Sequence, residues 1–260
     1  MYFLTNIHTL NVLFITIIKI MRNSDWRSIY EEILKDFGFD EERDKEAMRI
    51  ASEMMDHRGI GINSLRVQNE LEERINGKEA IICGNAPCLE DDIKAKGLER
   101  EPSQRGRVII AADGATSVLV RDAILPDVIV SDLDGYIPDI IYANRLGSIV
   151  IVHAHGDNIE MLKKVLPALN TNVICTAQSS PITPHGHASS NIFNFGGFTD
   201  GDRCVFIAKE FGARRIELLG FDFEDTQVTE RKKKKLKWAK RLIAGCTPKS
   251  RDERSGGEEG

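Results

Sequence analysis

The sequence has few of the features that mark secreted, membrane-spanning or nucleic-acid-binding proteins. Its five cysteines form no Cys-x-x-Cys pair, which indicates reduced thiols in the cytoplasm rather than a disulfide framework. There is no basic excess, since the net charge is -5, and we expect no nucleic-acid partner. Internal repeats are absent as well. The 260 residues are 42% hydrophobic and 29% charged, which is typical of a soluble globular protein with a sizeable core.

The apolar stretch in residues 1–20 lacks the marks of a targeting segment. It has neither the basic start nor the small-residue cleavage site of a signal peptide. Interspersed threonine, asparagine and histidine residues make it too polar for a membrane span, which needs about 20 mostly apolar residues. We prefer the interpretation that Met21 is the start and that this leader is an untranslated extension or is disordered. The alternative is a weak membrane anchor. We therefore expect no membrane partner.

Three changes of pattern divide the rest of the chain. Residues 21–76 repeat apolar side chains every three to four positions, which predicts an N-terminal helical segment. In residues 77–225 short apolar runs alternate with helical stretches, and this part is the expected catalytic core. Residues 226–245 predict a basic helix. Residues 246–260 are polar and glycine-rich, so we expect a disordered tail.

Seven short apolar runs in the core predict strands. They are continuously apolar rather than alternating, as in strands covered on both faces. Their succession with helices predicts an α/β fold with a doubly wound, mostly parallel sheet. Ligands in such sheets bind beyond the carboxyl ends of the strands, so the residues after each strand are the candidates for function. The predicted strands are residues 80–83, 108–112, 128–130, 149–152, 173–175, 192–195 and 216–219.

Three carboxylates follow two of the predicted strands. Asp113 follows one strand, and Asp132 and Asp134 follow the next in a D-x-D spacing. Carboxylates at positions i and i+2 of a turning backbone can converge on one ion. Mg²⁺ usually takes one or two carboxylates plus substrate phosphates, so we predict Asp132 and Asp134 as metal ligands. The alternative is that these acids cap the following helices or belong to an Asp-Gly turn.

The turn after the first strand predicts a phosphate-binding site. It contains Gly84, Asn85 and Ala86, which are therefore candidate nucleotide-binding residues. A glycine lets backbone amides approach a phosphate, and the following helix adds its positive N-terminal dipole. The alternative is that this strand-to-helix turn needs a glycine for its shape alone.

Two histidines and an acid follow the fourth strand. His155 lies nearer the loop and is a candidate for the nucleotide site, whereas His153 is expected to be packed and hydrogen-bonded. Asp157 is a further candidate for the chemistry, in contact with metal or substrate. A zinc site formed with His185 and His187 is another interpretation, but no cysteine lies near these histidines in a ligand spacing.

A dense polar group surrounds the predicted helix start near residue 200. Arg203 can bind a nucleotide phosphate in a bidentate way, and Asp200 can hydrogen-bond an amino-substituted ring. With Asp200, Thr199 and Asp222 complete the candidate substrate-binding set. The alternative is an N-cap at Thr199 or Asp200 with an ordinary ion pair. The lysines of the basic helix either face solvent or reach a triphosphate.

Six of these segments occur in a characteristic order. They are GNAP at 84–87, ADGA at 112–115, SDLDG at 131–135, HAHGDN at 153–158, FGGFTDGDR at 195–203 and LGFDF at 219–223. As an ordered set they resemble the archaeal 6-hydroxymethyl-7,8-dihydropterin pyrophosphokinases, which are related to thiamine pyrophosphokinases. The resemblance covers residues 21–243.

This resemblance implies that diphosphate is transferred from ATP to the hydroxymethyl group of the pterin, with Mg²⁺ as cofactor and with release of AMP. The product would serve the synthesis of tetrahydromethanopterin or a related pterin. The resemblance also implies Asp113, Asp132, Asp134 and Asp157 as metal and phosphate positions. For the reaction itself, either Asp113 or Asp157 is expected to accept the proton of the attacking hydroxyl. ATP and the hydroxymethylpterin are the expected partners, and a homo-oligomer is compatible with the sequence.

Three other functions stay open. A nucleotide-sugar glycosyltransferase is one, because a G-N-x-P turn also occurs in some sialyltransferase-like folds and a D-x-D pair can hold a metal on a sugar diphosphate. A thiamine-type pyrophosphokinase would perform the same chemistry on another ring. A non-enzymatic nucleotide or pterin sensor is less consistent with so many carboxylates, because their mutual repulsion opposes folding.

Overall fold

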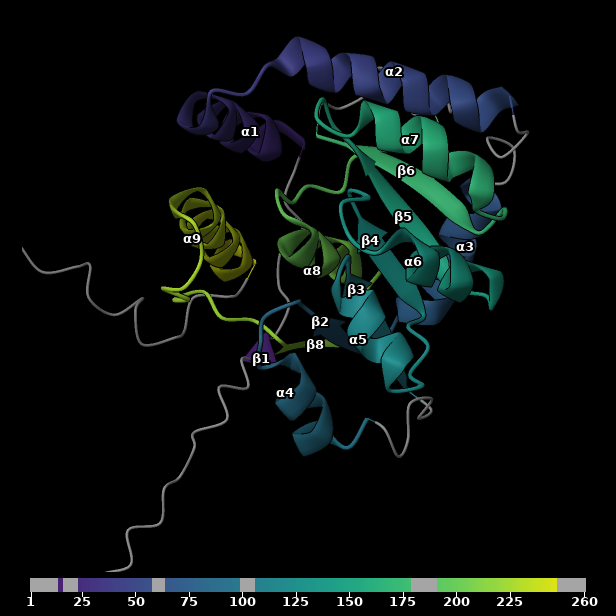
Figure 1. Cartoon of the computed structure of the whole chain (residues 1–260), viewed down its shortest axis with the longest axis vertical. Coiled ribbons are helices and arrows are strands. Elements are labelled where there is room, and N and C mark those ends of the chain that lie inside the picture. Colours follow the sequence, from purple (N-terminus) through teal and green to yellow (C-terminus); the bar gives the residue numbers. More distant parts are fainter. Residues whose placement is uncertain (1–13, 16–22, 58–63, 99–105, 179–190, 247–260) are drawn as a thin grey trace, which may run out of the picture.

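The computed structural model describes residues 14–15, 23–57, 64–98, 106–178 and 191–246. Helices and strands alternate along most of the chain (Figure 1). The helices are α1 (Asn23–Phe37), α2 (Glu41–His57), α3 (Ser64–Ile75), α4 (Leu89–Lys96), α5 (Ala115–Arg121), α6 (Ile137–Arg145), α7 (Ile159–Val165), the 3-10 turn η2 (Leu166–Ala168), α8 (Asp200–Glu210) and α9 (Glu230–Gly245). The strands are β1 (Phe14–Ile15), β2 (Glu79–Cys83), β3 (Arg107–Ala112), β4 (Val128–Ser131), β5 (Ile149–Ala154), β6 (Val173–Ala177), β7 (Ile192–Phe193) and β8 (Arg215–Leu219).

The strands form one sheet in the order β1-β8-β2-β3-β4-β5-β6-β7. Strands β2 to β8 are parallel to their neighbours, and β1 pairs with β8 in the antiparallel direction. All seven predicted strands are present. Strand β7 ends at Phe193 rather than at residue 195, because the side chain of Asn194 donates to the Gln178 carbonyl (2.8 Å) and accepts from the Gly196 amide (2.9 Å). These bonds turn the chain out of the sheet.

The sheet is covered on both faces, as its continuously apolar strands require. Successive side chains of a strand point to opposite faces, so Ala80 and Ile82 join one core while Ile81 and Cys83 join the other. The first core includes side chains of α1, α3, α8 and α9, and the second includes side chains of α2 and of α4 to α7. The predicted α/β fold with a doubly wound, mostly parallel sheet is confirmed.

The three helices of the N-terminal segment do not pack on one side of the sheet. Tyr30 of α1 and Leu71 of α3 lie in the first core, whereas Ala51 of α2 lies in the second. In Figure 1, α2 runs beside α7, while α1 faces α9. The link between α1 and α2 therefore passes the carboxyl edge of the sheet. The basic helix is present as α9. As domain boundaries, residues 76 and 225 stay predictions.

Within the described ranges, no helix combines the length and the apolar character that crossing a bilayer would require. Only Phe14 and Ile15 of the leader are described, as strand β1. The predicted disordered tail lies outside the described residues except for Cys246. His185 and His187, the histidines of the alternative zinc site, also lie outside them.

Candidate active site

A cavity of about 750 Å³ lies at the carboxyl edge of the parallel strands, with a volume in the range of small-molecule sites. Its walls are the turns after β2, β3, β4, β5 and β8, the start of α8, the α1–α2 link and α9. Among the predicted site residues, those that line the cavity are Gly84, Asn85, Ala86, Asp113, Asp132, Asp134, His155, Asp157, Thr199, Asp200 and Asp222. Arg203 does not line it.

Asp113 has an unusual backbone conformation at the end of β3. Its φ angle is 38°, in the left-handed region that residues other than glycine seldom adopt. The Asp113 amide donates to the Val130 carbonyl (2.7 Å), and its carboxylate accepts a hydrogen bond from the Ser131 hydroxyl. Gly135 lies directly against the carboxylate, because a Cβ at Gly135 would come within 2.3 Å of Asp113 Oδ2. Strained residues of this kind concentrate at functional sites.

Asp132 is held through both its side chain and its main chain. Its Oδ2 lies 3.4 Å from Nε2 of His155. Asn158 Nδ2 donates to the main-chain carbonyls of Asp132 (2.6 Å) and of His153 (2.7 Å), which ties the end of β4 to the end of β5. Sequence reasoning missed Asn158. It belongs to the HAHGDN segment at 153–158, but it directly precedes α7, where an asparagine is expected to cap the helix rather than to bridge two strands.

The start of α8 presents Asp200 to the cavity. Thr199 and Asp202 form a capping box in which Asp202 Oδ2 accepts from the Thr199 amide (3.0 Å) and hydroxyl (2.8 Å). Asp202 Oδ1 also accepts from the Phe198 amide (2.5 Å). The capping alternative therefore holds for Thr199, and its partner is Asp202. This arrangement leaves Asp200 to face the cavity.

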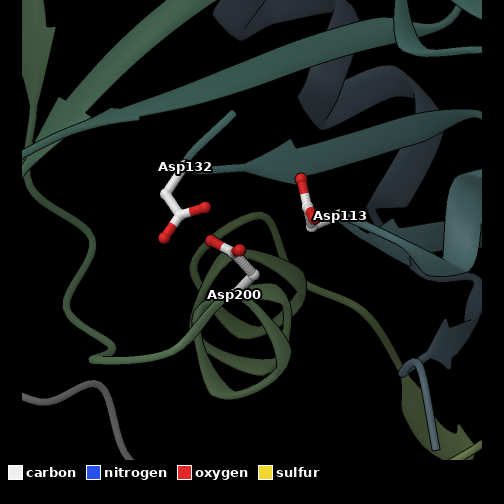
Figure 2. A group of neighbouring side chains, drawn as sticks. All are labelled: Asp113, Asp132 and Asp200. Atoms are coloured by element: carbon white, nitrogen blue, oxygen red, sulfur yellow. The ribbon is translucent and has the colours of Figure 1, made fainter. Parts of the chain in front are cut away.

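Asp113, Asp132 and Asp200 converge although they come from different elements. Figure 2 shows them at the ends of β3 and β4 and at the start of α8. One carboxylate oxygen from each lies within 4.8 Å of the others. Burial, followed by the charges of Asp132 and Asp113, raises the pKa of Asp200 well above its ordinary value. Burial, with Asp134 and Asp132 nearby, raises the pKa of Asp113 to about 7. We call these three residues the acidic triad.

The acidic triad fits a hard divalent cation. Burial acts to raise the pKa of Asp132, but the hydrogen bond with His155, the charge of His155 and smaller contributions from Asp134 and Lys235 together hold the pKa below the ordinary value. Carboxylates that share a partly buried site repel each other, and a cation removes that repulsion. A set of donors made only of oxygens suits Mg²⁺ better than zinc. The residues present therefore fit magnesium.

The other predicted acids lie farther out. Asp134 is exposed, next to Asp113, and its amide donates to Asp132 Oδ1 (3.3 Å). The side chain of Asp157 is 58% exposed and its Oδ1 lies 3.6 Å from Nη1 of Arg43. Asp222 accepts from the amide of Glu224 (3.0 Å) at the cavity edge. Asp132 thus meets Asp113 and Asp200 in the acidic triad, and the exposed Asp134 lies against both Asp113 and Asp132, so its role as a metal ligand stays a prediction.

The turn after β2 packs tightly against the turn after β8. A Cβ at Gly84 would lie 2.7 Å from the Gly220 carbonyl oxygen and 2.9 Å from the ring of Phe221. Gly84 is therefore needed for this close approach, whether or not the turn also binds a phosphate. The side chain of Asn85 lies over Gly114, which immediately precedes α5. Its contact with a nucleotide stays a prediction.

Arg203 is buried beneath the cavity, with 1% of its surface exposed. Its Nη1 donates to the Gly196 carbonyl (3.2 Å), and its Nε and Nη2 have no acceptor among the described residues. Burial lowers its pKa, while the charges of Asp200 and Asp202 oppose that effect. Arg203 therefore acts on the acids as a buried positive charge. Its contact with a nucleotide phosphate stays a prediction.

His153 is packed and hydrogen-bonded, as expected. Its Nδ1 lies 3.1 Å from the hydroxyl of Thr176, and the side chain is buried. Burial, followed by the positive charge of Arg203, lowers the pKa of His153 well below its ordinary value. The imidazole is therefore neutral at physiological pH.

One wall of the cavity was not expected from the sequence, and a second was expected only as one of two alternatives. The end of α1, the α1–α2 link and the start of α2 contribute Phe37, Phe39 and Arg43, respectively, and α9 contributes Arg231 and Lys235. Neither wall follows a parallel strand, so the rule that placed the other candidates does not apply to them. For α9 the basic run was a signal, because it raised the option of contact with a triphosphate. The α1–α2 link carried no comparable signal.

Comparison with known proteins identifies the family. The profile of a family described as 6-hydroxymethylpterin diphosphokinase MptE-like matches residues 61–228. Three similar curated proteins are named 6-hydroxymethyl-7,8-dihydropterin pyrophosphokinase. The one from Methanocaldococcus jannaschii is 39% identical over 86% of this chain and 95% of its own length. The one from Methanothermobacter thermautotrophicus is 43% identical over 76% of this chain and 77% of its own length. The one from Pyrococcus furiosus is 36% identical over 86% of this chain and 93% of its own length. The chain therefore belongs to the 6-hydroxymethylpterin diphosphokinase MptE-like family.

Proposed function

We propose that the protein transfers diphosphate from ATP to the hydroxymethyl group of 6-hydroxymethyl-7,8-dihydropterin and releases AMP. The observation that carries this proposal is the acidic triad, which lies in a cavity of about 750 Å³ where parallel sheets bind their ligands. The names of the three relatives supply the acceptor and favour it over thiamine or a sugar nucleotide. Membership of an enzyme family argues against a sensor without activity.

In the proposed reaction the hydroxyl oxygen of the pterin attacks the β-phosphorus of ATP. The new oxygen–phosphorus bond forms as the bond from the β-phosphorus to the α,β-bridging oxygen breaks, and that oxygen leaves with the bonding electrons as part of AMP. Bound Mg²⁺ would supply neutralisation of phosphate charge, and Asp132 and Asp200 would hold it. The remaining work of the chain is positioning: His155 and Asn158 fix Asp132, and Thr199 caps the helix that carries Asp200.

We assign the proton of the attacking hydroxyl to Asp113. This residue lies within the acidic triad, whereas Asp157, the other candidate base, lies at the exposed rim beside Arg43. Two carboxylates are sufficient for Mg²⁺ when substrate phosphates complete its shell, so Asp113 is available as a base. A homo-oligomer, the absence of nucleic-acid and membrane partners, and a cytoplasmic location all stay predictions.

The test is a product assay. The purified full chain is incubated with ATP and Mg²⁺ in the presence of 6-hydroxymethyl-7,8-dihydropterin, of thiamine, or of no acceptor, and AMP and the diphosphorylated product are measured. We expect both products with the pterin alone. AMP formed with thiamine but not with the pterin would show that thiamine, and not the pterin, is the acceptor. A nucleoside diphosphate released from a sugar nucleotide, with no AMP formed from ATP, would instead support the glycosyltransferase alternative.

Asp132→Ala provides the inactive control. We expect it to abolish AMP formation while the protein stays folded, because the variant removes a metal ligand whose side chain supports no part of the core. Chelation of divalent cations should abolish the wild-type activity, and added Mg²⁺ should restore it. Wild-type rates in Asp132→Ala at saturating Mg²⁺ would contradict the metal assignment.

A further inference from the structure

The basic side chains of helix α9 lie on two sides of the helix. Lys233, Lys234, Lys240 and Arg241 form ion pairs with Glu230, Asp36, Glu224 and Glu32, respectively. Arg231, Lys232 and Lys235 instead line the cavity, and none of these three forms an ion pair with a carboxylate of the described residues. Their spacing of three and four places them on one side of the helix. We call these three residues the α9 cation face.

Aromatic rings contact two members of the α9 cation face, Arg231 and Lys235. The guanidinium carbon of Arg231 lies 5.4 Å from the ring centre of Phe39, and Nζ of Lys235 lies 6.0 Å from that of Phe198. Helix α9 is itself fixed to α1, because Trp238 Nε1 donates to Asp36 Oδ2 (2.8 Å). An aromatic face attracts a cation but carries no net charge. The side chains are therefore positioned while their charges remain available to an anion.

The position of these cations within α9 also favours an anion. Arg231 and Lys232 lie in the first turn, where the helix dipole is positive and disfavours cations. Without an anion nearby, the two charges repel each other and oppose the dipole. Lys235 lies one turn further along α9 and lines the same cavity as Asp132 and Asp200. The α9 cation face and the acidic triad thus line the same cavity.

We propose that the α9 cation face binds the β- and γ-phosphates of the nucleotide, opposite Asp132 and Asp200. This inference rests on the proposed function, because it takes ATP as the ligand. The two terminal phosphates are the group to be transferred, and their negative charge requires cations on the side that the metal does not reach. The α-phosphate, ribose and base lie outside this contact, so AMP binds independently of the cation face.

The experiment compares nucleotide binding by calorimetry on the full chain with Mg²⁺, using α,β-methylene-ATP and AMP. Arg231→Ala and Lys235→Ala should each weaken binding of the triphosphate analogue about tenfold, with AMP affinity and melting temperature unchanged. Lys235→Arg should retain most of the affinity. Lys237→Ala is the matched control, because Lys237 belongs to the same helix but is exposed and does not line the cavity. It should bind both nucleotides as the wild type does.

Wild-type affinity for the analogue in the Arg231→Ala/Lys235→Ala double variant would overturn the inference. An equal loss for AMP and for the analogue would overturn it too, because the cations would then not act on the terminal phosphates. Turnover of the wild type separates this inference from the proposed function. If the enzyme turns over the pterin and the double variant binds the analogue normally, only the cation face is contradicted. If the analogue binds through the cation face but no pterin is turned over, only the proposed acceptor chemistry is contradicted.

Discussion

At the scale of single residues, the site keeps features that oppose folding. Asp113 adopts a left-handed backbone conformation with a φ of 38°, and such a conformation costs on the order of 1–3 kcal/mol in a residue with a side chain. Asp200 has a pKa raised by burial and by three neighbouring carboxylates, so its charged form is disfavoured. A cation bound between these residues would remove the repulsion. The two features together are most simply explained by binding a metal and a phosphate.

The two candidate bases can be separated by amide substitutions. Asp113→Asn should lower kcat by about a hundredfold or more, because asparagine keeps the size and the hydrogen-bond acceptor for Ser131 but cannot take up a proton. Asp157→Asn should lower kcat less than about tenfold, since its side chain is 58% exposed and pairs with Arg43 at the rim. AMP release at saturating substrates measures both. A larger loss for Asp157→Asn would reverse the assignment of the base.

At the scale of elements, the strand ends could be predicted and the helix start could not. Strands β3 and β4 are adjacent and parallel, so the sequence places Asp113 and Asp132 at one edge from the order of apolar runs alone. Asp200 follows β7, which lies at the far side of the sheet. It reaches the other two only because α8 crosses back beneath β2, β3 and β4 on its way to β8. No local pattern encodes that crossing, so the sequence analysis assigned Asp200 to substrate binding and not to the metal set of Asp132 and Asp134, which stays a prediction.

The same limit explains why the burial of Arg203 could not be predicted from the sequence. A charged residue in a glycine-rich turn sequence suggests an exposed phosphate ligand. Its burial follows from the tight approach of Gly197, where a Cβ would come within 2.6 Å of the Arg203 backbone. Gly197 has a φ of 91°, which side chains rarely permit, and so this turn packs directly on the start of α8. The sequence shows both residues but not that they touch.

The capping box of α8 can be tested apart from substrate binding. Thr199→Ala should lower the free energy of unfolding by about 1 kcal/mol, because it removes the hydroxyl that donates to Asp202 (2.8 Å). Thr199→Ser keeps the hydroxyl and should stay close to the wild type. Urea unfolding followed by circular dichroism measures both variants. Unchanged stability in Thr199→Ala would show that the cap is dispensable. A raised KM for the pterin in Thr199→Ala but not in Thr199→Ser would support the predicted contact of Thr199 with substrate.

At the scale of the whole molecule, segments from both ends of the described chain complete the site. Phe37 ends α1, Phe39 belongs to the α1–α2 link, and Lys235 belongs to α9. The apolar periodicity of these helices predicts that each has a buried face. It does not predict which face of the sheet they cover, because either face offers the same kind of apolar surface. The sequence therefore predicts the fold and the residues at the carboxyl edge of the sheet more completely than it predicts the walls of the cavity.

The buried thiols report on the integrity of the central sheet. Cys83 in β2 and Cys175 in β6 are fully buried, and burial raises the pKa of each thiol to about 12 from an ordinary value of 9.0. None of the five cysteines is disulfide-bonded. A thiol-specific reagent at neutral pH should therefore leave Cys83 and Cys175 unmodified in the native protein and label both of them on unfolding.

These pKa shifts also set the sign of the response to alkaline pH. Because each pKa is higher in the folded state, the contribution of the protonated thiols to stability is fully present below pH 9.0 and is lost as the pH rises toward about 12. The urea midpoint should therefore fall between about pH 8.5 and about pH 10.5. The midpoint should fall less in the Cys83→Ala/Cys175→Ala double variant. Because this variant is less stable than the wild type, the change of its own midpoint with pH is measured and not the absolute value. An equal fall in the double variant would show that other groups, and not these thiols, make the fold sensitive to alkali.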